Sequence, residues 1–439
     1  MAQKKKKKKK PQPAQPLVRL SQVMIVKNEE KNIETALGWA KGIAFEQIVV
    51  DTGSTDRTVE LAEKMGAKVV YFEWINDFGA AKNFAIEQAS GNWIAFLDAD
   101  EYFTKEHAKK MMGHIKKIQA DPLMRENWLV LHCPWLQMDD NGNTAAVNEQ
   151  GRVFRNLPSI RYVGRIHESL SVAQENTVLA DDIAIVHTGY TETAYLDTQK
   201  LDRNIKLLRD ELKDRPNDMN MKGYLADSLK SKGDPESLAE TERLFREVLD
   251  GDGDVLPALR KRAFMFILTR PQDTDSALTE KETLCKAARE EFPGDLDFEY
   301  CQAVIFNKRG RYKEAMEILT SCEKKLLGTV SHTESETLAL NPVILFWQMM
   351  IASKGLGDLP GVVRAATMTL TADKTQDGVL NNYIAALLKN NISHDEIVQL
   401  LSKVYNMNDQ RDLLFIARAA KSCNALEFAK YIIGLAEIK

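Results

Sequence analysis

The feature that most constrains the fold is an alternation of short apolar runs with helical patterns between residue 18 and about residue 100. The apolar runs occupy residues 20–26, 46–51, 68–74 and 93–98, and an amphipathic segment separates each from the next. Strands that alternate with helices in this way are typical of βαβ units and a parallel sheet. We therefore expect an α/β domain over residues 18–195, with these four runs as neighbouring strands.

Each of the four runs is followed by a polar segment. These segments read "VKNEE", "DTGSTD", "NDFGAAKN" and "DADE" in chain order. In open parallel sheets, ligands bind outside the carboxyl ends of the strands. The sequence therefore predicts that the four polar segments line one crevice.

The last of these segments places Asp98, Asp100 and Glu101 directly after the apolar "IAFL". Carboxylates this close repel each other unless a cation, a proton or solvent lies among them. Asp98 and Asp100 would share one side of an extended chain, which suits a divalent ion that also binds phosphate oxygens. A solvated acidic turn is the alternative. Asp51, the first residue after its strand, could accept hydrogen bonds from a base or ribose, or serve only the turn.

The remainder of the chain divides into a mixed part and a helical part. Residues 104–195 contain strand-like runs, and the pattern from residue 196 to residue 439 is helical. Residues 222–250 and 298–326 look alike, each with a glycine turn at Gly233 or Gly310 between two helical patterns. They resemble degenerate tetratricopeptide helix hairpins, which stack because one hairpin cannot bury its own apolar face. Residues 196–439 are thus expected to form an all-α helical-repeat domain.

Charge and hydropathy limit the choice of partners. Residues 4–10 are consecutive lysines, and residues 1–17 should form a disordered tail. The tail is either simply solvated or a peripheral contact with anionic lipid at the inner face of the membrane. Because the net charge is −4 despite these lysines, nucleic acid is not expected as a partner. No apolar run is long enough to span a bilayer, and we expect a cytoplasmic protein.

Taken together, "MIVKNEE", "VVDTGSTDRT", "NDFGAAKN" and "WIAFLDADE" resemble the nucleotide-sugar half of a family 2 glycosyltransferase of GT-A fold. The resemblance covers residues 20–103 and extends through "GRVFRN", "GRIHE" and "IVHTGY" to about residue 190. With the helical-repeat tail, the layout is similar to that of sublancin-type peptide S-glycosyltransferases.

The resemblance implies a role for each matching position. The nucleotide sugar, expected to be UDP-linked, would bind to a set of residues from all four segments and from "GRVFR": Val26, Asn28, Glu29, Asp51, Lys82, Asn83, Asp98 and Arg155. Arg152 could contact the diphosphate together with Arg155, or both could simply be exposed strand residues. Asp98, Asp100 and His187 would hold Mg²⁺ or Mn²⁺, with a structural histidine as the alternative for His187. Relatives often carry arginine in place of Lys82.

The resemblance also implies an inverting transfer, in which a base takes a proton from the acceptor. The acidic pair that many family members use is missing at the expected place. Glu168 of "GRIHE" is the first candidate for the base and His167 the second, although both could form a surface salt bridge with Arg165 instead.

The predicted function is therefore metal-dependent transfer of a sugar to a peptide side chain or a saccharide. The helical domain would select the acceptor or form a homodimer. A phosphatase of the haloacid dehalogenase type is rejected. That class has its aspartate pair near the first strand, whereas Asp98 and Asp100 follow the fourth predicted strand of this chain. The remaining alternative is a non-catalytic helical-repeat interaction protein that carries a relic GT-A domain.

Overall fold

The computed structural model describes residues 17–139, 142–188, 198–251, 253–327 and 336–437. Its contacts divide the chain into two compact units, Met1–Leu238 and Ala239–Lys439, which we describe separately. The expected tail lies almost entirely outside the described residues, and its state stays a prediction.

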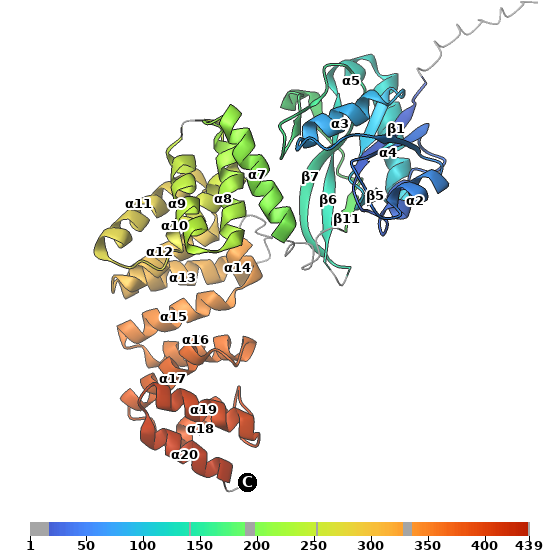
Figure 1. The fold of residues 1–439 in the computed structure, drawn as a ribbon. Helices are drawn as coiled ribbons and strands as arrows, with labels where there is room; N and C mark the ends of the chain where they lie inside the picture. Colours follow the sequence, from blue (N-terminus) through green and yellow to red (C-terminus); the bar gives the residue numbers. More distant parts are fainter. Residues whose placement is uncertain (1–16, 140–141, 189–197, 252, 328–335, 438–439) are drawn as a thin grey trace, which may run out of the picture. The chain divides into compact units, whose positions relative to one another are not determined.

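The first unit contains a nine-stranded sheet (Figure 1). Along its main path the order is β3-β2-β1-β4-β7-β6-β11-β5, and β10 pairs with β6. The strands are β1 Leu20–Val26, β2 Glu46–Asp51, β3 Lys68–Tyr71, β4 Trp93–Phe96, β5 Glu101–Phe103, β6 Val130–Met138, β7 Thr144–Arg155, β10 Thr177–Leu179 and β11 Ile185–His187.

The four strands predicted from the apolar runs form the parallel half of the sheet. β1 pairs in parallel with β2 and β4, and β2 pairs in parallel with β3. The third strand ends at Tyr71 and not at residue 74, because its partner β2 ends at Asp51, the residue opposite Tyr71. The second half joins through β7, which is antiparallel to both β4 and β6.

Alternate residues of the central strands face two different cores, as the two-residue period of a strand requires. Val23 and Ile94 pack with Ala85 and Ile86 of helix α3, Phe78–Glu87, on one face. On the other face, their neighbour Ala95 packs with residues of helix α4, Lys105–Ala120. The sheet is thus buried on both sides, which is why its parallel strands read as continuous apolar runs.

Helices and one small hairpin complete the first unit. The hairpin pairs β8 Tyr162–Val163 with β9 Ser169–Leu170. The helices are α1 Ile33–Gly38, α2 Thr58–Lys64, α3 Phe78–Glu87, α4 Lys105–Ala120, α5 Pro122–Asn127, α7 Thr198–Asp214 and α8 Met219–Lys232. Strands give way to helices between β11 and α7, close to the expected change at residue 195, but α7 and α8 belong by their contacts to the first unit.

In the described residues of the second unit, every regular element is a helix, and turns and loops join the helices. It begins within α9 Pro235–Asp250. The other helices are α10 Pro257–Leu268, α11 Asp275–Glu291, α12 Leu296–Lys308, α13 Tyr312–Leu327, α14 Glu336–Leu340, α15 Val343–Leu356, α16 Leu359–Ala372, α17 Asp377–Lys389, α18 His394–Leu401, α19 Gln410–Ser422 and α20 Leu426–Glu437. Both predicted glycine turns occur, since Gly233 and Gly310 have φ angles of 74° and 72°.

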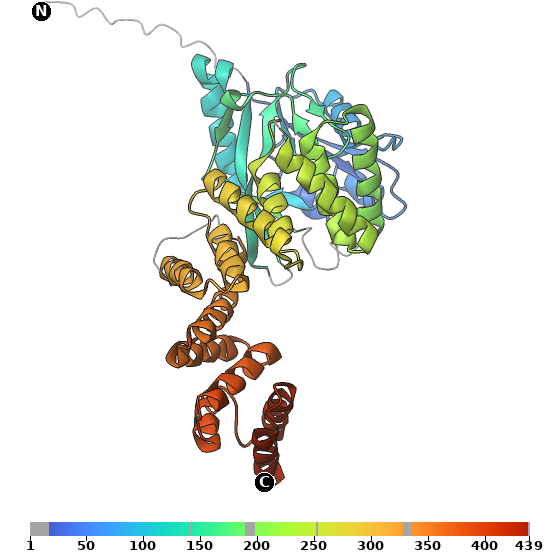
Figure 2. The same ribbon diagram turned by 90° about the vertical axis from the view of Figure 1, so that its left-hand side faces the viewer.

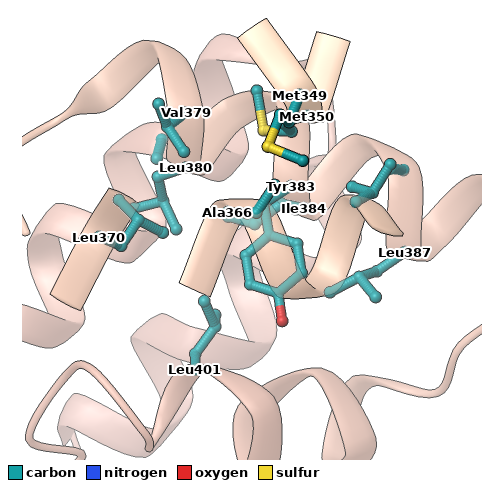
Figure 3. Close-up of a cluster of buried hydrophobic side chains, with 14 of the residues drawn as sticks. Met349, Met350, Ala366, Leu370, Val379, Leu380, Tyr383, Ile384, Leu387 and Leu401 are labelled. Carbon is teal, nitrogen blue, oxygen red and sulfur yellow. The ribbon is translucent and has the colours of Figure 1, made fainter. Parts of the chain in front are cut away.

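In this unit α15 packs against α16, α16 against α17, α17 against α19 and α19 against α20, and the chain runs from orange to red through these helices (Figure 2). A continuous core joins them, and Figure 3 shows Tyr383 of α17 among aliphatic side chains of neighbouring helices. This arrangement is what stacked helix hairpins require, because each one buries its apolar face against the next. Within the described residues, no helix is both long and apolar enough to cross a bilayer.

Candidate functional site

The turn after β2 is organised by Asp51. This side chain is buried, and its carboxylate accepts hydrogen bonds from the backbone N–H groups of Gly53 and Ser54, at 3.1 Å each. Gly53 has a φ angle of 105°, a conformation that glycine adopts without strain. Asp51 therefore has the turn role that the sequence allowed, and it also stands at the carboxyl end of β2, where a ligand role was predicted.

The segment after β1 packs against the same turn. Val26 ends β1, and its carbonyl accepts hydrogen bonds from the backbone and the hydroxyl of Thr52, both at 3.0 Å. The side chain of Asn28 accepts from the backbone of Thr55 at 2.8 Å. Burial raises the pKa of Glu29, against a hydrogen bond from Asn32 that lowers it. The first two polar segments thus meet, as predicted from the common edge of the sheet.

Asp98 lies between two cations. Its Oδ1 is 3.4 Å from Nζ of Lys82, and its Oδ2 accepts a hydrogen bond of 2.6 Å from Nη2 of Arg152. Burial would raise the pKa of Asp98, but the two cations outweigh it and lower that pKa. The repulsion expected among the acids after β4 is therefore relieved at this position by the protein's own charges.

Lys82 is a buried cation at the centre of this arrangement. Its side chain is only 5% exposed, and Nζ lies 2.6 Å from Oε1 of Glu168. The ammonium also lies 5.3 and 5.1 Å from the ring centroids of Phe96 and Tyr162, within cation–π range. Burial opposes its charge, yet Asp98 and Glu168 raise the pKa of Lys82 above its usual value. Lys82 therefore links the segment after β4 to the "GRIHE" segment.

Asp100 and His187 meet through the pairing of β5 with β11. Oδ2 of Asp100 lies 3.3 Å from Nε2 of His187. The imidazole stacks on Trp135 of β6, with ring centroids 4.4 Å apart and an angle of 28° between the planes. Nδ1 of His187 is buried without a hydrogen-bond partner in the part of the chain that the structure describes. The predicted neighbourhood of Asp100 and His187 is thus present.

The two candidate bases have different environments. Glu168 joins the cluster through its ion pair with Lys82, and its side chain is 12% exposed. His167 has a φ angle of 51°, and its ring stacks on Tyr224 of α8 with centroids 3.7 Å apart. Arg165, the partner named in the surface alternative, pairs instead with Asp214 of α7. Glu168 thus contacts the cationic centre directly, through Nζ of Lys82.

Two predicted ligand residues have contacts that do not fit the expected role. Arg155 lies opposite Trp93 at the start of β4, away from the edge where Asp98 stands, and donates to the carbonyl of Arg125 at 2.8 Å. The antiparallel register brings Arg152 to that edge, and a nucleotide-sugar contact of Arg155 stays a prediction. Asn83 uses its amide on the backbone N–H and carbonyl of Tyr162, at 2.8 and 2.9 Å.

Some residues of the site carry a weak sequence signal or none. Arg152 and Arg155 stand together in "GRVFR", and only the register of β7 against β4 separates them. The sequence shows Glu101 as the third acid of "DADE", but it does not indicate which residues Glu101 contacts. Trp135 lies in "PWLQM", where nothing distinguishes it from a core residue.

The donors at this edge could hold a divalent ion only together with a ligand. Among the described residues, no group of three or more His, Cys, Asp or Glu side chains is arranged to hold a metal ion alone. Asp100 and His187 are two adjacent donors, and Mg²⁺ sites commonly use one or two carboxylates and complete their shell with substrate phosphates. Asp100 and His187 therefore fit an ion that would bind together with a diphosphate.

The fold and this edge define an α/β domain with a cluster of charged side chains at the carboxyl ends of its strands, where parallel sheets commonly bind ligands. The family model described as "Glycosyl transferase family 2" matches residues 21–124. The first unit therefore contains a family 2 glycosyltransferase domain, as its four polar segments predicted.

Curated relatives extend the similarity beyond that domain. A TPR repeat-containing protein of Synechococcus elongatus is 30% identical over 60% of this chain and 64% of its own length. An uncharacterized glycosyltransferase of Rickettsia bellii is 47% identical over 40% of this chain and 59% of its own length. The SPbeta prophage-derived glycosyltransferase SunS of Bacillus subtilis is 27% identical over 44% of this chain and 45% of its own length. The chain thus spans less than two thirds of each of these relatives.

Among solved structures, S. aureus TarS 1–349 aligns with 62% of this chain and 91% of its own, at 17% identity and a TM-score of 0.33. This likeness is too weak to support an argument, and the assignment of the domain rests on the family model and the curated relatives.

Proposed function

We propose that the protein transfers a sugar from a nucleotide sugar, UDP-linked, to a peptide side chain or a saccharide, with inversion at the anomeric carbon. The observation that carries the proposal is the placement of Asp51, Asp98, Asp100 and His187 at one edge of a family 2 glycosyltransferase domain. Buried cations accompany these acids, and a diphosphate needs positive charge around it.

A Mg²⁺ or Mn²⁺ ion held by Asp100 and His187 would offset the charge that develops on the departing diphosphate. The protein's own side chains would bind the nucleoside and supply further positive charge. Asp51 and the turn that it organises would bind the nucleoside. Lys82 and Arg152 supply positive charge beside Asp98.

Glu168 is the proposed base. A base must be within hydrogen-bond reach of the acceptor's proton and must be unprotonated before it reacts. Its carboxylate is mostly buried in the same cluster as Asp98, with Lys82 between them. The protein would act in the cytoplasm, with the helical unit presenting the acceptor or forming a homodimer.

The test is a calorimetric titration of UDP into the full-length protein, with Mn²⁺ and with EDTA. We expect binding that requires Mn²⁺ in the wild type and is lost in Asp100→Ala. A panel of UDP-sugars and acceptors then identifies the substrates. Absence of UDP binding in every condition would contradict the proposal and favour the alternative function, an interaction protein built on its helical unit.

A further inference from the structure

The third acid of "DADE" is almost completely enclosed by protein. Glu101 is 1% exposed, so its carboxylate is not available to a ligand. Burial raises the pKa of Glu101 and Arg152 lowers it, and the net shift is upward. A buried carboxylate is destabilising unless each oxygen has a partner. The partners that Glu101 has are therefore informative about its role.

Three groups donate to Glu101, and they come from different parts of the sheet. Its Oε1 accepts from Nη2 of Arg152 at 2.7 Å and from Nε1 of Trp135 at 2.9 Å. Its Oε2 accepts from the backbone N–H of Asp98 at 3.0 Å. One side chain of β5 thus ties together β6, β7 and the turn after β4.

The first of these contacts positions a cation. Nη2 of Arg152 is shared between Glu101 and Asp98, at 2.7 and 2.6 Å. The Nε atom of Arg152 is buried without a hydrogen-bond partner within the described residues. The two carboxylates therefore hold the guanidinium by one nitrogen, and removal of the charge of Glu101 would free it to move relative to Asp98.

The second contact positions an aromatic ring. The indole of Trp135, oriented by its N–H donation to Glu101, forms the face on which His187 stacks. Histidines that bind metals usually have their orientation fixed by a hydrogen bond at the second ring nitrogen. In the described part of the chain that nitrogen of His187 has none, so the stack on Trp135 takes over this task.

We infer that Glu101 is a positioning residue for both halves of the site: it holds Arg152 against Asp98, and through Trp135 it holds His187 opposite Asp100. This inference rests on the proposed function, because it concerns the site where the nucleotide diphosphate and its ion would bind. Glu101 itself touches neither.

The test compares Glu101→Gln, Trp135→Phe and the double variant with the wild type. Glu106→Gln, an exposed acid of α4 paired with Lys110, is the matched control. We expect Glu101→Gln to weaken Mn²⁺-dependent UDP binding by about 10- to 100-fold, the usual effect of losing a group that orients a metal ligand. Trp135→Phe should also weaken UDP binding. The affinity of the double variant should be no lower than that of the single variant with the lower affinity, because both substitutions act on one network.

A second readout does not depend on any ligand. The indole N–H resonance of Trp135, identified by its loss in Trp135→Phe, should shift in ¹⁵N spectra of Glu101→Gln and stay in place in Glu106→Gln. If Glu101→Gln does not fold, Trp135→Phe decides, since it removes the indole donor together with part of the ring on which His187 stacks.

The inference is overturned if the wild type needs Mn²⁺ to bind UDP and Glu101→Gln, or in its absence Trp135→Phe, binds equally well. It is also overturned if the effects of the two single variants multiply in the double variant. If the wild type does not bind UDP in any condition, the proposed function itself is contradicted, which is a different result from a failure of the inference on Glu101.

Discussion

Nζ of Lys82 lies 2.6 Å from Oε1 of Glu168 and 3.4 Å from Oδ1 of Asp98, so that one buried cation joins the proposed base to the acidic segment after β4. Helix α3 supplies the lysine, and Glu168 lies between β8 and β9. Four predictions follow from this and related contacts.

Lys82→Met should destabilise the first unit. The substitution leaves Asp98 and Glu168 without a shared cation, and breaking a buried ion pair costs about 3–5 kcal/mol of unfolding free energy. Urea unfolding measures the loss. Adding Glu168→Gln to Lys82→Met should recover part of it, since the second charge is then also removed. Lys110→Met, which breaks an exposed pair with Glu106, should change little, and an equal loss there would refute the assignment.

Metal removal should abolish the thermal stabilisation that UDP gives. A ligand at 100 times its Kd stabilises the folded protein by about 2.7 kcal/mol. We expect UDP with Mn²⁺ to raise the Tm of the wild type and to lose this effect in EDTA. In Asp100→Asn and His187→Gln the Tm with UDP should be nearly the same with and without Mn²⁺. A Tm shift that survives in both variants would place the ion elsewhere.

Gly79→Ala should loosen the contact between α3 and the "GRIHE" segment. A Cβ atom at this position would lie 2.4 Å from the carbonyl oxygen of Gly164, so one of the two backbones must move. Overpacking of this kind costs about 1–3 kcal/mol, and UDP binding should weaken with it. Gly113→Ala in α4 is the control: its Cβ meets nothing within 4 Å, and loss of a helical glycine should stabilise by up to about 1 kcal/mol.

Glu46→Gln should reduce stability at neutral pH but not in acid. Its carboxylate accepts 2.6 Å hydrogen bonds from the Ser21 hydroxyl and the Ser90 backbone. Burial would raise the pKa of Glu46, but these bonds prevail and lower that pKa below its ordinary value of 4.5. The stabilisation is therefore present above pH 4.5 and is lost as the pH falls through the lower pKa of the folded state.

Urea unfolding at pH 7 and at decreasing pH tests this prediction. The difference between wild type and Glu46→Gln should be about 1–2 kcal/mol at pH 7 and should shrink on acidification. Glu87→Gln, at an exposed position of α3, is the control. A difference that does not depend on pH would show that the carboxylate's charge is not involved.

The sequence was most informative where one strand and its own turn decide the structure. β1 and β2 have the predicted bounds, because apolar runs buried on both faces end where polar segments begin. The predicted end of β3 was wrong, because the strand's end depends on the length of its partner β2 and not on residues 72–74. Gly233 and Gly310 were found because each glycine turn is local.

The location of the site could be predicted from the sequence, but most of the contacts within it could not. Asp51, Asp98 and Asp100 are at the predicted edge because parallel strands end together. Whether Arg152 or Arg155 reaches that edge depends on the register of β7 against β4. This register cannot be predicted from a short sequence motif. The contacts of Lys82 with Glu168 and of Glu101 with Trp135 join segments that are distant in the chain, and side-chain packing alone creates them.

The strand order also has a consequence for biosynthesis. β5 pairs with β11, so the residue after Asp100 obtains its sheet partner only when the ribosome has made His187. Until then the acidic end of β4 lacks its imidazole neighbour. Pairings over such long sequence distances form slowly. A nascent chain that is released before β11 would therefore carry the motifs of the family but no assembled site, so truncated fragments should be inert even where their sequence looks complete.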